Sequence, residues 1–155
     1  MTVGDPTHPP PRHSARVWRL GWTVVVVNVV AAVVAVVMNW PAQFGQVGTD
    51  ARVDVLAKGT AISAPALPML LLVLALAGVR IGRQWNVIGL TGFCVVAVLV
   101  LIGGLGETFA PGTSDTPKTV LVASGVVWAG IAASMITVAI AAFAEHRQGA
   151  TRARR

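Results

Sequence analysis

The stretch LGWTVVVVNVVAAVVAVVM, residues 20–38, decides the fold of this 155-residue chain. Its 19 residues include no Asp, Glu, Lys, Arg or His. A helix of that length, rising about 1.5 Å per residue, is roughly 28 Å long and matches the ~30 Å hydrocarbon core of a bilayer. Valine favours strands in water, but a lone strand in lipid leaves its backbone polar groups unsatisfied. The stretch therefore predicts a transmembrane helix.

Three further apolar runs lack charged residues and histidine in the same way; they are residues 61–79, 87–105 and 119–143. These runs are too long, and alternate too little, to be strands of an outer-membrane barrel. Only 12% of the residues are charged, against about 25% in a soluble domain. We therefore predict an all-α integral membrane protein, an up-down bundle of four transmembrane helices. Pro65 and Pro68 fall inside the second run, and Pro68 is expected to bend that helix.

The first run has an alternative interpretation, a cleaved signal peptide. Its apolar stretch exceeds the ~7–15 residues usual for such a segment, and the Val-x-Ala sequence that cleavage would use lies inside the run. We therefore expect the run to stay as a membrane helix. The predicted organisation is a disordered, proline-rich cytoplasmic tail over 1–16, a four-helix membrane domain over 17–146, and a basic cytoplasmic tail over 147–155.

The arginines predict how the chain is threaded. Nine of them lie in the two tails and in the link between the second and third runs, where the only acids are Asp5 and Glu145. Because short segments rich in Lys and Arg stay in the cytoplasm, both termini are predicted there. Abundant Ala, Val and Arg with little Lys indicates a GC-rich bacterial genome, hence the plasma (inner) membrane. The arginines assigned to headgroups and topology are Arg12, Arg16, Arg19, Arg80, Arg83, Arg147, Arg152, Arg154 and Arg155.

The sequence offers no catalytic, cofactor or metal site. Cys94 is the only cysteine, which excludes a Cys-x-x-Cys redox pair or a cysteine zinc site. His8, His13 and His146 form no pair across the membrane of the kind that binds haem. The apolar runs contain no carboxylate for proton-coupled transport. Since these reactive groups are missing, no enzyme activity and no cofactor are expected. No nucleic-acid partner is expected either, because the C-terminal arginines are a small electrostatic footprint.

Small side chains in the fourth run predict close helix packing. They recur every four residues, at Gly125, Ala129, Ala133, Thr137 and Ala141. Trp128 sits well inside the same run, whereas the other tryptophans flank the apolar runs at headgroup level. The longest connection, residues 39–60, includes a short alternating stretch at 52–55 that suits either a strand or a turn of surface helix.

Asn28 is the one strongly polar side chain near the middle of the first run, with Ala32 on the same face. Its amide is expected to point inward and bond to Ser134 or Thr137 of the fourth run, or to Thr91 of the third. Such a bond is a polar clasp inside the bundle; the alternative is that Asn28 lines a substrate path.

Two classes of function follow from these features. The first is a non-enzymatic accessory or scaffold subunit that packs through small-residue helix faces, with the lipid bilayer around it and a homo-oligomer or larger membrane complex as its partner. The second is a small oligomeric transporter or channel with Asn28 near its path.

Overall fold

The computed structural model describes residues 12–43, 50–81, 83–111 and 116–152. These residues form helices and connections without strands, apart from isolated bridges in the connections. The helices are α1 (Arg12–Met38), α2 (Ala51–Ala57), α3 (Ala66–Ile81), α4 (Arg83–Phe109) and α5 (Lys118–Arg152).

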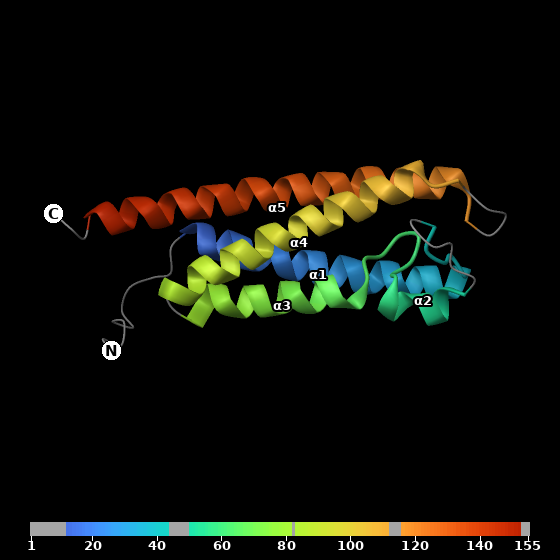
Figure 1. Cartoon of the computed structure of the whole chain (residues 1–155), viewed down its shortest axis with the longest axis horizontal. Coiled ribbons are helices and arrows are strands. Elements are labelled where there is room, and N and C mark those ends of the chain that lie inside the picture. The colour runs from blue at the N-terminus through green and yellow to red at the C-terminus, as the bar shows by residue number, and fades with distance from the viewer. Residues whose placement is uncertain (1–11, 44–49, 82, 112–115, 153–155) are drawn as a thin grey trace.

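Four helices form an elongated bundle (Figure 1). Helix α1 begins and α5 ends at the same end of the bundle, called here the termini end. Helix α2 and the longer connections lie at the opposite, loop end. Helix α4 runs diagonally, beside α3 at the termini end and beside α5 at the loop end. This diagonal course separates α3 from α4 towards the loop end.

Three helices of the described chain are long and apolar enough to cross a membrane, over residues 15–38, 85–109 and 118–148. Helix α3 has only 16 residues, and its length of roughly 24 Å falls short of the ~30 Å hydrocarbon core. Large apolar side chains such as Val30, Leu74 and Ile140 are exposed on the outer faces. An apolar exterior needs an apolar solvent, so the long apolar helices indicate a membrane protein.

The bundle core follows a spacing of alternating four and three residues. On α5 the buried positions are Leu121, Gly125, Trp128, Ala132, Met135, Ala139 and Ala142. On α1 they are Val17, Gly21, Val24, Asn28 and, one full heptad later, Ala35. This mean period of 3.5 residues is the seam of helices that pack at a shallow angle, as in coiled coils.

Two helix boundaries differ from the sequence-based prediction. The second apolar run was expected to be helical from residue 61, but α3 begins at Ala66. Pro68 therefore lies in the first turn, where backbone N–H groups have no partner within the helix, and the predicted bend at Pro68 is wrong. Helix α5 extends to Arg152, into the range assigned to the basic tail.

At the other terminus, α1 begins at Arg12, inside the range 1–16 assigned to the proline-rich tail, and residues 1–11 lie outside the described part. The alternating stretch 52–55 forms the short helix α2 rather than a strand. Asp50 caps this helix, because its side chain accepts a 2.8 Å hydrogen bond from the Arg52 backbone N–H.

Candidate functional site

Residues 60–65, called here the 60–65 loop, connect α2 to α3 without helical structure. The loop closes on itself, since the Thr60 N–H donates to the Ser63 carbonyl at 3.0 Å and the two hydroxyl oxygens lie 2.8 Å apart. Gly59 leads into it with φ of +82°, and a Cβ there would lie 2.6 Å from the Ser63 carbonyl oxygen. Only glycine fits that position without strain.

Side chains of α1 and α5 hold the loop backbone. The Ala64 N–H donates to Asn28 Oδ1 at 2.7 Å, and Asn28 Nδ2 donates to the Ala64 carbonyl at 3.4 Å. Trp128 Nε1 donates to the Ile62 carbonyl at 2.8 Å. Asn28 and Trp128 are each 6% exposed. One amide thus satisfies the donor and the acceptor of Ala64, while the indole satisfies Ile62.

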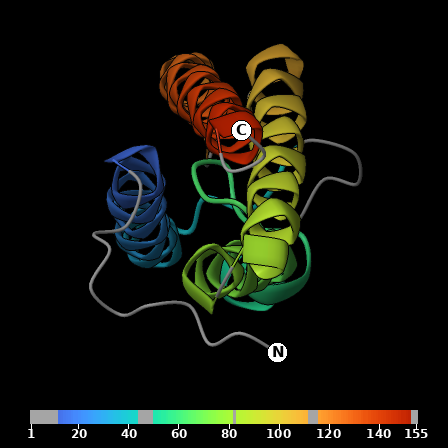
Figure 2. The same ribbon diagram turned by 90° about the vertical axis from the view of Figure 1, so that its left-hand side faces the viewer.

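These contacts lie deep in the bundle. Asn28 is ten residues before the end of α1, and Trp128 is ten residues after the start of α5. At about 1.5 Å per residue, both are ~15 Å from the loop end, near half the depth of a bilayer. Seen from the termini end, the loop runs among the helices (Figure 2). Irregular backbone at such depth is tolerated only where protein or a cavity surrounds it.

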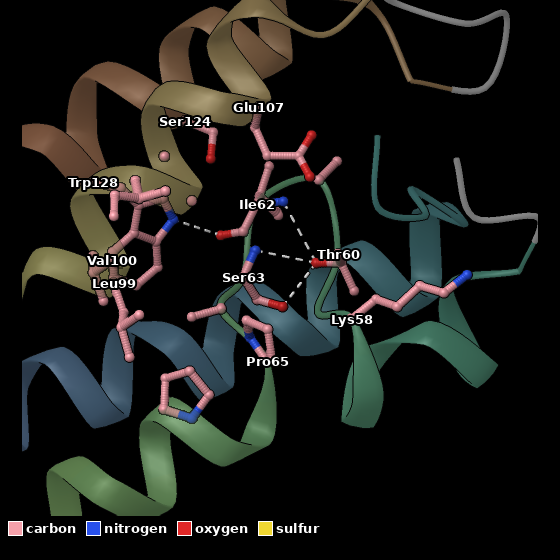
Figure 3. A pocket seen from close by; sticks show the side chains of 16 residues that line it. Lys58, Thr60, Ile62, Ser63, Pro65, Leu99, Val100, Glu107, Ser124 and Trp128 are labelled. Carbon is pink, nitrogen blue, oxygen red and sulfur yellow. Dashed lines mark hydrogen bonds between the residues drawn. The ribbon is translucent and has the colours of Figure 1, made fainter. Parts of the chain in front are cut away.

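The 60–65 loop, α4 and α5 border a cavity of about 250 Å³, called here the loop-end cavity (Figure 3). Its deeper wall is apolar and includes Leu99, Val100 and Trp128. Polar groups of Lys58 and Glu107 also line it. The arrangement suits an apolar guest with a polar end.

The segments around the cavity mouth are fixed by hydrogen bonds. The Glu107 carboxylate accepts from the Gln43 backbone N–H at 3.1 and 3.3 Å, which ties the chain after α1 to α4. Lys58 Nζ lies 3.5 Å from Asp54 Oδ1. Lys118 donates to the carbonyls of Thr108 and Ala110 and so caps the C-terminal end of α4. The region of the mouth therefore combines two cations, Lys58 and Lys118, with two carboxylates, Asp54 and Glu107.

The structure partly agrees with what was expected of Asn28. The side chain is buried and has a partner, but the partner is the Ala64 backbone. The predicted partners were wrong: the hydroxyls of Ser134, Thr137 and Thr91 each donate at 2.9 Å to a carbonyl four residues earlier in their own helices. All three residues are exposed. Ala32, on the Asn28 helix, is half-buried.

The four-residue repeat of α5 does not follow one face of the packed bundle. Gly125 is buried and Ala129 half-buried, but Ala133 and Thr137 are exposed. The cause is geometric, because a step of four residues advances about 40° beyond a full turn and the repeat drifts around the helix. At Gly125 α5 approaches α4 closely, since a Cβ there would lie 2.6 Å from the Gly104 carbonyl oxygen.

Those arginines assigned to headgroups and topology that the structure describes lie at the termini end, whereas Arg52 belongs to α2 at the loop end. The Arg80 guanidinium lies 4.2 Å from the centre of the Trp18 ring and joins α3 to α1 by a cation–π contact. Arg16, Arg19 and Arg147 are exposed at the same end. The backbones of Arg12, Arg83 and Arg152 belong to helix ends there, whereas Arg154 and Arg155 fall outside the described residues.

The 60–65 loop is the feature that sequence reasoning missed. Its signals were Trp128, whose buried N–H needs an acceptor, and the Thr, Ser and Pro residues between 60 and 68, which suit a turn better than a helix. Within the described residues, no group of three His, Cys, Asp or Glu side chains is placed to hold a metal ion. A scan against models of protein families, a search of the curated proteins and a search of the solved structures each found no match.

Proposed function

We propose that this protein is a non-enzymatic subunit of a membrane complex, crossing the plasma membrane four times with both ends in the cytoplasm. Helices α1, α4 and α5 each supply one crossing. The remaining one, second in chain order, consists of α3 together with the 60–65 loop, which supplies the ~6 Å of length that α3 lacks. The basic termini end supports the cytoplasmic assignment, because short Arg-rich segments are retained on that side.

The observation that carries this proposal is a line of small residues on the outward face of α5. They follow the same spacing of four and three as the core, at Gly130, Ser134, Thr137, Ala141 and Ala144. Among the described residues, nothing lies within 4 Å of a Cβ built on Gly130. Lipid tails are as apolar as leucine, so helices associate in membranes chiefly by close contact between such small residues. The line is suited to a helix of a second copy or of another subunit.

Disulfide crosslinking in native membranes tests the association. In a Cys94→Ala background, Ser134→Cys is expected to form a crosslinked species on mild oxidation. Leu74→Cys is the matched control, because Leu74 is exposed on α3 among bulky side chains. Equal crosslinking at both positions, or none at Ser134→Cys together with a monomeric protein in mild detergent, would contradict the proposal.

A small transporter or channel is the second candidate, and the 60–65 loop is the observation that favours it. Interrupted helices often form the binding sites of transporters near mid-membrane. In this candidate Asn28 shapes the path by holding the loop. Solute flux into proteoliposomes, lost in Asn28→Leu, is the expected result; the absence of flux for ions and small polar solutes would remove the candidate.

A further inference from the structure

We propose that the loop-end cavity binds one acyl chain of a zwitterionic phospholipid whose headgroup ends in a primary ammonium group. The inference goes beyond the association of α5 and requires only that the protein lies in a bilayer. It rests on where the cavity opens, on the order of its polar and apolar walls, and on the charges at its mouth.

The cavity opens towards lipid because α4 leaves α3. At the termini end the two helices touch, and a Cβ on Gly89 would lie 2.5 Å from the Ala75 carbonyl oxygen. Towards the loop end α4 contacts α5 instead (Figure 1). Leu99 and Ile102 line the cavity and are 41% and 52% exposed, so the described helices do not close this side of it. A lipid chain therefore has a lateral entrance from the bilayer.

The cavity wall is apolar in the depth of the bundle and polar near the loop end. A lipid in one leaflet has the same order, with its acyl chains deep and its headgroup at the surface. Leu99 is ten residues before the end of α4, whereas Glu107 is two residues before it. At about 1.5 Å per residue, the apolar wall is ~15 Å deep and the carboxylate only ~3 Å. Lys58 leads into the loop on the same side. A chain lying along the apolar wall would thus place its headgroup between Lys58 and Glu107.

The volume fits a chain rather than a whole ligand. At about 250 Å³, the cavity is smaller than the ~300–1,000 Å³ pockets that enclose a complete drug-sized molecule. Gly103 lines the cavity, and a Cβ built on it meets no described atom within 4 Å. The acyl chain would occupy this open space beside Gly103.

The charges at the mouth select the headgroup. Lys58 offers an ammonium group to a phosphate, and Glu107 offers carboxylate oxygens to a cation. Asp54 already lies 3.5 Å from Lys58, and Lys118 lies at the same end of α4 as Glu107. The four side chains therefore carry no net charge. A headgroup with a phosphate and a primary ammonium group complements this set, whereas a purely anionic headgroup does not.

Photolabelling of the full-length protein in phosphatidylcholine vesicles tests the site. The probe is phosphatidylethanolamine with a diazirine in its acyl chain, and the adducts are mapped by mass spectrometry. We expect labelling concentrated at 99–107, reduced about tenfold in Gly103→Leu, a loss equivalent to ~1.4 kcal/mol. The same chain on phosphatidylglycerol should label these residues less, and Glu107→Gln should remove the difference between the two lipids.

Gly130→Leu is the matched control, since Gly130 also faces open space but lies away from the cavity. It should keep the labelling and lose the α5 crosslink, whereas Gly103→Leu should do the reverse. Labelling spread evenly over the exposed residues of α4, unaffected labelling in Gly103→Leu, or equal labelling by the two lipids would overturn the inference. Absence of the Ser134→Cys crosslink in a protein that still labels as expected would count only against the association of α5.

Discussion

At the scale of single residues, Asn28 joins two elements that are remote in the sequence. Replacing it by Leu keeps the volume but leaves the N–H and C=O of Ala64 without their partners. An unsatisfied buried polar group costs about 1–3 kcal/mol. We expect Asn28→Leu to lower the melting temperature in detergent, while Val29→Leu, at an exposed neighbouring position, does not. Equal melting temperatures for the two variants would contradict the role assigned to Asn28.

A second residue-scale prediction concerns the coupling between Asn28 and Trp128. Trp128→Phe keeps an aromatic ring in place but removes the donor to the Ile62 carbonyl. Because both side chains hold the same loop, its release by either substitution removes part of what the other stabilises. The double variant should therefore be more stable than the sum of the two losses predicts, by about 0.5–3 kcal/mol. Unfolding measured for all four proteins of the cycle checks this, and strict additivity would show that the two contacts act independently.

At the scale of the helix, the crossing of α4 and α5 depends on Gly125. Gly125→Ala would place a methyl group 2.6 Å from the Gly104 carbonyl oxygen, so the helices must separate. Overpacking of this kind costs about 1–3 kcal/mol, partly offset by the ~1 kcal/mol that Ala gains over Gly in a helix. Gly130→Ala on the same helix gives the gain without the clash. We expect thermal unfolding of the monomer to rank Gly130→Ala above Gly125→Ala; the opposite order would refute the close crossing.

The helices also show how far the sequence could be interpreted. Length and the lack of charge identified residues within α1, α4 and α5 as apolar helices, because the bilayer thickness dictates that pattern. The start of α3 was misplaced by five residues, because the absence of charge in 61–65 outweighed the turn signals of Ser63 and Pro65 in the sequence-based prediction. That loop exists because of contacts from Asn28 and Trp128, and no local pattern encodes such distant contacts.

At the scale of the whole molecule, the proposed threading makes the two ends of the bundle chemically accessible from opposite sides. In a Cys94→Ala background, Val53→Cys on α2 is expected to react with a membrane-impermeant maleimide added to intact cells. Arg147→Cys, at the termini end, should react only after the membrane is opened. Both side chains are exposed, so burial does not decide the result. Reaction of Arg147→Cys in intact cells would reverse or invalidate the orientation.

The hydrogen bond between Trp128 and Ile62 has a consequence for biosynthesis, because its partners are 66 residues apart. When the second apolar run leaves the ribosome, the indole that will satisfy its Ile62 carbonyl has not yet been made. Until α5 has inserted, that carbonyl must bond to water or to a chaperone, since lipid offers no donor. Folding of the 60–65 loop therefore waits for α5, and a nascent chain halted before Trp128 would expose an incompletely folded segment to membrane quality control.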